Sequence, residues 1–318
     1  MAVPLWKRAK RSVRAALVRG GVRLLSRLPL RAALAVGGVG GRMAWALSPA
    51  LRCDMRAGLG TAFPEQDAAR LDAIARDSLV HLGWVGGEMV ALRPQALERY
   101  VEVAPEALAT IHRVRLRGRG IVMVLGHIGN WELTCRLAPL LGSVGVIAKR
   151  TWHRSLDVLA ERARAANGVA TLWRSDAGTG RSMLKLLKTG GTLGILIDQD
   201  IESVQNVFVP FFHRLAATPR GAADLALRSG AAVLVVTCHR RGPKAGDGHR
   251  LEVVEVPYDA SASDGEAEVV RLTAACTRLQ EAAIRSKPAE WVWMHRRWKT
   301  RPVPEGTVAA GSPERRRG

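Results

Sequence analysis

A regular alternation of apolar runs and amphipathic stretches between residues 119 and 286 is the feature that most constrains the fold. The apolar runs predict strands at about 119–125, 143–148, 168–172, 192–198, 231–237 and 250–256. The stretches between and after them predict helices at about 130–141, 153–166, 179–188, 218–229 and 266–286. Such alternation is typical of an α/β protein with a mostly parallel, mixed sheet flanked by helices. Because Gly242 to Gly248 predict a hairpin loop, we expect the strand at 250 to run antiparallel.

The N-terminal part has a different character. Residues 66–93 predict one long helix, and residues 7–28 predict a basic amphipathic helix that Pro29 interrupts. The first 60 residues carry twelve basic residues and one acidic residue, which is +11 of a net charge of +20. A protein with this charge attracts polyanions such as nucleic acid, anionic lipid, a phosphorylated substrate or an acidic protein. A general preference of the genome for arginine would account for part of the excess.

Residues 32–41 are uncharged and rich in glycine, and Arg42 follows them. A helix that crosses a membrane needs about 20 apolar residues, so an anchor lying in the membrane interface is the better interpretation. A cleaved signal peptide is not expected. We predict a membrane-associating segment at 1–50, a catalytic domain at 51–302 and a disordered basic tail at 303–318. With four scattered cysteines and no metal-binding spacing, we expect reduced thiols, no zinc and a body that faces the cytosol.

His127 and Glu132 lie where the strand at 119–125 is followed by a helix. Ligands of open α/β sheets collect at this end of the strands. Since Gly129 and Asn130 allow a turn, a carboxylate of Glu132 bonded to one ring nitrogen would leave the other nitrogen of His127 as a general base. Asn130 and Trp131 would position this pair or an acyl chain. The structural alternative is a histidine and an acid at the start of a helix, with Asn130 as its N-cap and Trp131 in the packing.

Basic residues follow the next two strands at the same edge of the sheet. Lys149 and Arg150 come after 143–148, and Arg174 is a weaker candidate after 168–172. They would bind phosphate groups of a substrate, or they would be solvated loop residues. Thr218 and Arg220 would bind an anion at a helix start, or would simply cap it.

Several segments in order resemble the glycerolipid-type acyltransferases. The stretch His127-Ile-Gly-Asn-Trp-Glu132 is similar to their H-x4-D/E signature, in the form found in the bacterial lipid A late acyltransferases. Residues 58–65, 198–200, 207–221 and 288–299 resemble further blocks of that branch, over roughly 52–304.

This resemblance implies an O-acyltransferase that moves a fatty acyl group from a thioester to a glycolipid hydroxyl, most simply that of a lipid A precursor. It implies His127 and Glu132 as catalytic residues, no cofactor and no metal. Asp198 and Asp200 would support the site. The donor would be acyl carrier protein or acyl-coenzyme A, and the place of action the cytoplasmic face of the inner membrane. The alternatives are another glycolipid or phospholipid acceptor, such as a phosphatidylinositol mannoside, and a non-enzymatic basic module that binds nucleic acid or membrane.

Near the C-terminus, tryptophans alternate with cations. Trp291, Trp293 and Trp298 stand close to Arg296, Arg297 and Lys299. This composition is typical of a membrane-interface belt or a single-stranded nucleic-acid groove. The basic N-terminus favours the belt, and no nucleic-acid partner is expected. His295 is expected to be a structural hydrogen-bond donor.

Overall fold

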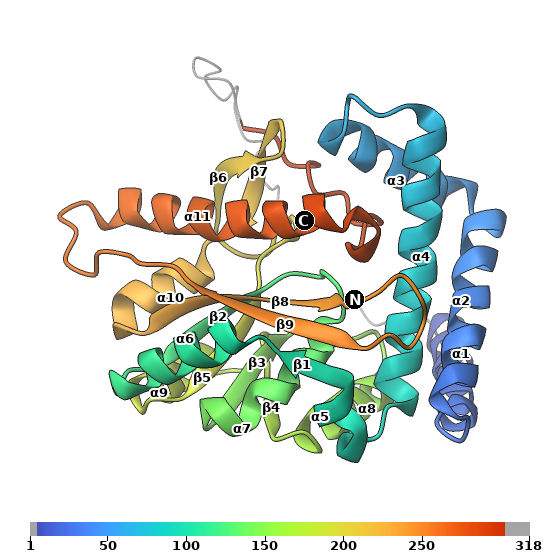
Figure 1. Ribbon diagram of the computed structural model, residues 1–318, viewed down its shortest axis with the longest axis horizontal. Coiled ribbons are helices and arrows are strands. Elements are labelled where there is room, and N and C mark those ends of the chain that lie inside the picture. The colour runs from blue at the N-terminus through green and yellow to red at the C-terminus, as the bar shows by residue number, and fades with distance from the viewer. Residues whose placement is uncertain (1–4, 303–318) are drawn as a thin grey trace, which may run out of the picture.

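The computed structural model describes residues 5–302, without the side chains of residues 5 and 7–9. A seven-stranded sheet with the order β1-β9-β8-β2-β5-β3-β4 forms the centre, and β6 and β7 form a separate hairpin (Figure 1). The strands are β1 (Val101–Val103), β2 (Ile121–Leu125), β3 (Val144–Ala148), β4 (Val169–Trp173), β5 (Thr192–Leu196), β6 (Asn206–Phe211), β7 (Arg214–Pro219), β8 (Ala232–Arg240) and β9 (His249–Glu255).

Fourteen helical segments surround the sheet in the described part of the chain. The α-helices are α1 (Leu5–Leu25), α2 (Leu30–Leu47), α3 (Pro49–Ala62), α4 (Ala68–Ala91), α5 (Leu97–Tyr100), α6 (Pro105–Leu116), α7 (Ala138–Leu141), α8 (Arg154–Ala165), α9 (Thr179–Lys188), α10 (Gly221–Ser229) and α11 (Gly265–Ser286). The 3-10 helices are η1 (Pro94–Ala96), η2 (Trp131–Leu137) and η3 (Pro288–Glu290).

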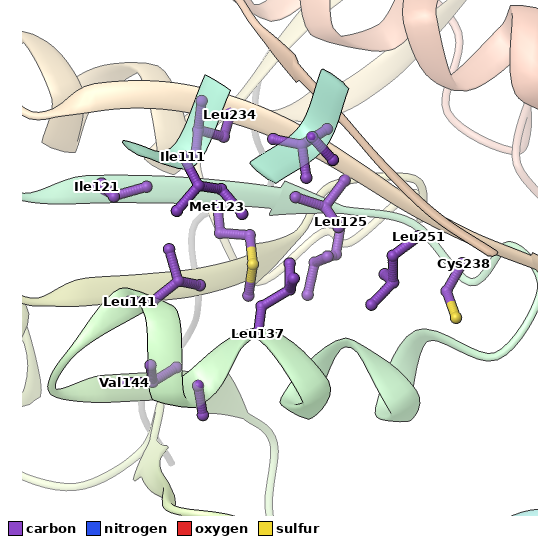
Figure 2. Close-up of a cluster of buried hydrophobic side chains, with 14 of the residues drawn as sticks. Ile111, Ile121, Met123, Leu125, Leu137, Leu141, Val144, Leu234, Cys238 and Leu251 are labelled. Atoms are coloured by element: carbon purple, nitrogen blue, oxygen red, sulfur yellow. The ribbon is translucent and has the colours of Figure 1, made fainter. Parts of the chain in front are cut away.

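The central strand β2 shows why helices cover both faces of the sheet. All five of its residues are buried, and successive side chains of a strand point to opposite faces. Ile121, Met123 and Leu125 face a cluster with α6, η2 and α7, where Leu137 and Leu141 lie below β2 (Figure 2). The two valines between them face a second cluster built on α9, α10 and α11.

The predicted α/β architecture is confirmed. Strands β2, β3, β4, β5 and β8 run parallel, and β9 pairs with β8 in the antiparallel direction. All six predicted strands are present, each within a few residues of its expected ends. β1 is an additional edge strand that pairs with β9.

Two predicted helices differ from the structure. The segment 130–141 forms a 3-10 helix followed by one short α-helix, after a turn at Gly129 with a φ of 59°. The predicted helix at 218–229 begins only at Gly221. Thr218 and Pro219 belong to β7, whose partner β6 alternates buried and exposed residues as a strand of a hairpin does.

The first four helices stand together beside one end of the sheet (Figure 1). A break at 26–29 separates α1 from α2, as Pro29 predicts. Glycines bring α2 against α4: a Cβ on Gly37 would lie 2.1 Å from the Gly83 carbonyl oxygen, and one on Gly83 would lie 2.0 Å from the Gly37 oxygen. The glycines of α2 therefore form a helix–helix interface.

The outward face of α2 is apolar. Val36, Val39, Met43 and Leu47 are 50, 51, 54 and 74% exposed, and their spacing of three and four residues places them on one stripe. We call these four residues the α2 stripe. Within residues 5–302, no helix combines the length and hydropathy needed to cross a bilayer.

The expected membrane belt of tryptophans is wrong. Trp291 and Trp293 are 1% exposed and Trp298 is 7% exposed. They pack edge-to-face and tilted against Phe211 and Phe212. Their apolar area is therefore used to hold the C-terminal segment against the β6–β7 hairpin and α3.

Candidate active site

The register between β2 and β5 places His127 beside Asp198. Leu125 pairs with Leu196 in this parallel ladder. The residue two positions beyond each therefore emerges at the same edge of the sheet. His127 Nδ1 lies 2.9 Å from Asp198 Oδ1, and the His127 backbone N–H donates to Oδ2 at 2.7 Å.

Asp198 is 1% exposed, and its carboxylate faces the His127 imidazole. Its Oδ2 also accepts a hydrogen bond from Trp291 Nε1 at 2.8 Å. Burial alone would raise the pKa of the Asp198 carboxyl, but the charge of His127 and these hydrogen bonds hold that pKa well below its ordinary value. An ionised Asp198 fixes the proton of His127 on Nδ1 and leaves Nε2 with a free lone pair.

Glu132 does not contact the His127 ring, in contrast to the expected pairing. The turn at Gly129 and the 3-10 helix η2 direct Glu132 toward α8, where Arg164 Nη2 and Nε bind its two oxygens at 2.6 and 3.1 Å. Both side chains are about one-fifth exposed. His127 and Glu132 nevertheless line the same cleft, together with Arg164.

This cleft has a volume of about 820 Å³ and collects residues from the carboxyl ends of β2, β3, β4 and β5. Trp131 lies on one wall, with its ring 4.8 Å from the His127 ring. Lys149 and Arg174 also line it, as their positions after β3 and β4 predict. Arg228 at the end of α10 is a further cation of the lining, besides Arg164. The cleft is therefore basic around a central imidazole.

Asn130 is not part of the cleft. Its side chain is fully buried, and its Nδ2 donates to Glu88 Oε2 at 2.7 Å. Glu88 also binds His249 at 3.0 Å and pairs with Arg240 at 2.8 Å. Although burial would raise the pKa of Glu88, these partners lower it to about 2. Asn130 therefore fixes the loop after His127 to a buried charged network.

Three other candidates have side chains that are already bound by protein partners. Arg150 is bound bidentately by Asp176 and lies 4.9 Å over the Trp173 ring. Thr218 is fully buried in β7, where Arg297 Nη2 donates to its Oγ1 at 2.5 Å. Arg220 does line the cleft, but Asp224 and Glu266 already pair with its guanidinium.

Asp200 accepts two hydrogen bonds from Thr300, at 2.8 Å from the backbone N–H and 2.9 Å from Oγ1. It therefore ties the segment after β5 to the C-terminal segment. Among residues 5–302, no cluster of histidine, cysteine or carboxylate side chains has the geometry of a metal site. The four cysteines, all within this range, are free thiols.

A narrow apolar cavity opens beside the cleft. Trp131, Glu132, Arg164, Ile147 and Leu196 line both. From there the cavity runs between the sheet and the end of α4. Its deeper walls are Met89, Leu92, Leu97, Met123, Leu125, Leu133, Ala138, Leu141, Val144, Val146 and Val169.

Arg164, Gln199 and Glu88 were not predicted as functional residues. Arg164 lies within a helix that also carries Arg154 and Arg162, so no sequence signal separates it from them. Gln199 lies between the two predicted carboxylates and contacts His127. Glu88 lies at the end of a long helix, and only the three-dimensional packing brings it to Asn130.

Comparison with known proteins decides the family. Residues 7–300 match the family described as bacterial lipid A biosynthesis acyltransferase. The chain belongs to this family. Its matched range includes the whole sheet and every residue of the cleft.

The names of individual relatives also describe acyltransferases. The chain is 26% identical over 257 residues to the lipid A biosynthesis palmitoleoyltransferase of Escherichia coli (strain K12), covering 80% of each chain. It is 30% identical over 207 residues to the lauroyltransferase of the same organism, covering 65% of this chain and 64% of the relative. A phosphatidylinositol mannoside acyltransferase of Mycolicibacterium smegmatis is 28% identical over 184 residues, 57% of each chain.

Proposed function

We propose that this acyltransferase transfers a fatty acyl group from an acyl thioester to a hydroxyl of a lipid A precursor, with His127 as general base. The observation that carries the proposal is the contact of His127 with the buried Asp198, on an imidazole that lines a basic cleft. Asp198 holds the tautomer in which Nε2 accepts a proton, as the base of such a reaction requires.

The reaction then proceeds without a covalent acyl-enzyme. His127 Nε2 takes the proton of the acceptor hydroxyl as its oxygen attacks the thioester carbonyl carbon. The carbon–sulfur bond of the resulting tetrahedral intermediate breaks, and the thiolate leaves with the proton that His127 releases. Asp198 stabilises the imidazolium that exists between these two steps. The products are an ester and a free thiol.

Arg164 and Glu132 take a different part in this mechanism. Two of the five N–H donors of Arg164 bind Glu132, and the guanidinium lines both the cleft and the apolar cavity. A thioester carbonyl at the junction of the two would develop its negative charge near this cation, which lowers the barrier. Glu132 would act by orienting Arg164.

The apolar cavity is the proposed site for the acyl chain. Most of its lining residues are apolar, and it begins next to Trp131. Burying methylene groups there contributes roughly 0.8 kcal/mol each. Lys149, Arg174 and Arg228 would bind phosphates of the acceptor or donor in the wider cleft.

Membrane association and the donor belong to the same proposal. The basic α1 helix and the apolar α2 stripe are each suited to contact with an anionic leaflet, consistent with action at the cytoplasmic face of an inner membrane. A protein with a charge of +20 also attracts an acidic acyl carrier protein. The division into an anchor at 1–50 and a domain at 51–302 remains a prediction, and the predicted tail at 303–318 lies outside the described residues.

The deciding experiment presents purified protein with acyl carrier or coenzyme A thioesters and with either a lipid A precursor or a phosphatidylinositol mannoside. Mass spectrometry follows the acylated lipid. We expect transfer to the lipid A precursor and none with His127→Ala. Preference for the mannoside would favour the alternative suggested by the mycobacterial relative. Binding of lipid without transfer by any thioester would support the non-enzymatic module instead.

A further inference from the structure

The cleft that His127 lines extends to both faces of the sheet. One part adjoins the apolar cavity, whose walls belong to the first cluster with α6, η2 and α7. Another part is lined by Ile195, Met183 and Leu225, which belong to or pack against the second cluster with α9, α10 and α11. The edge of the sheet that carries His127 therefore lies between two apolar regions.

The second region is a groove between α9 and α10, which pack against each other. Residues three, four and seven positions apart lie on one face of a helix. The cleft is lined on α9 by Gly180, Met183 and Leu184, and on α10 by Gly221, Asp224, Leu225 and Arg228. Each helix therefore gives one continuous face to the groove. Because a helix rises 1.5 Å per residue, the span from Gly221 to Arg228 corresponds to a length of about 10 Å.

Most side chains that line this groove are aliphatic. Ile147 and Ile195 contribute from the sheet, and the half-buried Met183, Leu184 and Leu225 contribute from the two helices. An aliphatic surface that remains partly exposed in a cleft gains free energy when a hydrocarbon covers it.

The polar side chains of α10 do not change this character. Asp224 is paired with Arg220 at 3.0 Å, which neutralises its charge. Arg228 is exposed, whereas Leu225 packs against the second cluster. The groove therefore has an aliphatic interior and a polar margin along α10.

Glycine occupies the first turn of both helices. Gly180 is the second residue of α9, and Gly221 is the first residue of α10. Both line the cleft, and a Cβ added to either would meet no atom of the described residues within 4 Å. The two glycines therefore keep this end of the groove open.

We propose that the groove between α9 and α10 binds a hydrocarbon chain of the acceptor lipid, next to the hydroxyl that His127 deprotonates. The acyl chain of the donor thioester occupies the cavity on the opposite face of the sheet, so that the two lipids meet at the edge that carries His127. The inference rests on the proposed function and adds to it a second apolar site, for the acceptor.

The chemistry of the two substrates supports this assignment. A lipid hydroxyl that enters a cleft draws the neighbouring chain out of the bilayer, and each methylene group exposed to water weakens binding by roughly fourfold. An apolar groove that belongs to the same cleft as His127 offsets this cost. The part of a thioester donor beyond its sulfur is a pantetheine arm, whose amide groups need hydrogen-bond partners. The aliphatic interior of the groove suits a hydrocarbon better than this arm.

The test uses purified full-length protein, an acyl carrier thioester and detergent-dispersed lipid A precursor analogues that differ in the length of their acyl chains. Gly180→Leu and Gly221→Leu each place a side chain at the open end of the groove. We expect each variant to lower kcat/KM for the acceptor with full-length chains by about 10-fold or more. Gly265→Leu is the matched control, because this glycine begins α11 with equally open surroundings among the described residues and does not line the cleft. It should leave turnover unchanged.

The dependence on chain length separates a filled groove from general structural damage. In the wild-type protein, kcat/KM should rise roughly two- to fourfold for each methylene of the acceptor chain that enters the groove. In Gly221→Leu this rise should be lost. The preference among donor chain lengths should be the same in both proteins, because the cavity lies on the other face of the sheet. Met183→Gln keeps the length of the side chain and places an amide in the groove, so it should also reduce the rise.

An unchanged dependence on acceptor chain length in Gly221→Leu would overturn the inference. A changed preference among donor chains would overturn it too, because the groove would then hold the donor chain. A higher KM for the carrier thioester alone would assign the groove to the pantetheine arm instead. If neither leucine variant folds, Met183→Gln decides by the same measurement.

The proposed function fails separately, if His127→Ala keeps wild-type turnover. An inactive His127→Ala beside a Gly221→Leu protein with the wild-type dependence on chain length would remove only the groove as the acceptor site.

Discussion

Two carboxylates near His127 have different surroundings, and these set their roles. Asp198 is buried, bound to the imidazole and held by a tryptophan N–H. Glu132 is partly exposed and engaged by a guanidinium. In a dyad, the carboxylate on Nδ1 stabilises the imidazolium, so we assign that role to Asp198 and the orientation of Arg164 to Glu132.

Asp198→Asn should lower kcat by on the order of 10² to 10⁴-fold, because an amide keeps the shape but loses the charge that stabilises the imidazolium. Steady-state kinetics with circular dichroism as a check of folding would measure this. Asp200→Asn is the matched control two residues away, since Asp200 contacts Thr300 rather than His127. Equal losses in the two variants would remove the distinction between them.

Glu132→Gln should lower kcat by on the order of 10²-fold through Arg164, the size of effect seen when one donor to a developing oxyanion is lost. Arg164→Lys should have a similar effect, because Lys cannot reproduce the bidentate contact. The double variant should then be no slower than either single variant. If instead the two losses multiply, Glu132 acts on the chemistry by a separate route.

His127 could be predicted from its own surroundings, whereas its partner could not. A histidine after a buried strand and before a turn has a local signature. The choice between Glu132 and Asp198 depends on β5 being the neighbour of β2 in register, which no local pattern contains. Asn130 illustrates the same limit, because its partner Glu88 lies 42 residues away on α4.

At the scale of elements, the long periodic segments were predictable and the close contacts were not. The strands of the sheet are runs of apolar residues buried on both faces, which is a strong signal. The β6–β7 hairpin was missed because Pro210 and Pro219 suggest a loop, although an edge hairpin tolerates proline. The sequence shows that α2 is rich in glycine, but it does not show what these glycines contact. Their contacts with α4 are found only in the packed structure.

The α2–α4 interface supplies a stability test. Gly83→Ala would place a Cβ 2.0 Å from the Gly37 carbonyl oxygen, so the helices must separate at a cost of about 1–3 kcal/mol. Gly86→Ala on the same helix meets no atom within 4 Å and should stabilise by roughly 0.5–1 kcal/mol through helix propensity. Urea unfolding of both variants would measure the difference. A Gly83→Ala protein as stable as Gly86→Ala would contradict the close packing.

At the scale of the whole molecule, buried histidines couple stability to pH. Burial is the main reason that the pKa of His81 falls to about 4. Burial is also the main reason that the pKa of His295 falls to about 4. The unfolded chain protonates these rings near pH 6.5. Between pH 6.5 and 4 it therefore binds protons that the folded protein does not, and the free energy of unfolding falls as pH falls.

The expected slope is at most roughly 1.4 kcal/mol per pH unit for each histidine. The buried carboxylates affect the free energy of unfolding in a lower pH range. Because the pKa values of Asp198 and Glu88 are lowered in the folded protein, their stabilising contribution is lost only below about pH 4. Urea midpoints between pH 7.5 and 4.5 would show the decline. His81→Gln, which cannot titrate, should flatten it, and an unchanged slope in that variant would exclude His81 as a source.

Membrane binding is the last property of the whole molecule that the surface predicts. Deleting α2 would strip a packed face from α4, so point changes are the cleaner test. Val39→Glu with Met43→Glu places two charges on the α2 stripe and leaves the α4 interface intact. Leu116→Glu with Val254→Glu is the matched control, because these residues are 75 and 46% exposed on α6 and β9.

We expect the stripe variant to bind anionic liposomes at least about 10-fold more weakly in a sedimentation assay, because each charge opposes burial of the apolar face in the interface. Its turnover of detergent-dispersed acceptor should remain normal, since the cleft lies on other elements. Added salt should weaken the wild-type protein as well, because the basic residues of α1 contribute roughly 1 kcal/mol each near an anionic surface. Equal binding by the stripe variant and its control would show that the α2 stripe does not enter the membrane, and would leave the cationic α1 helix as the contact.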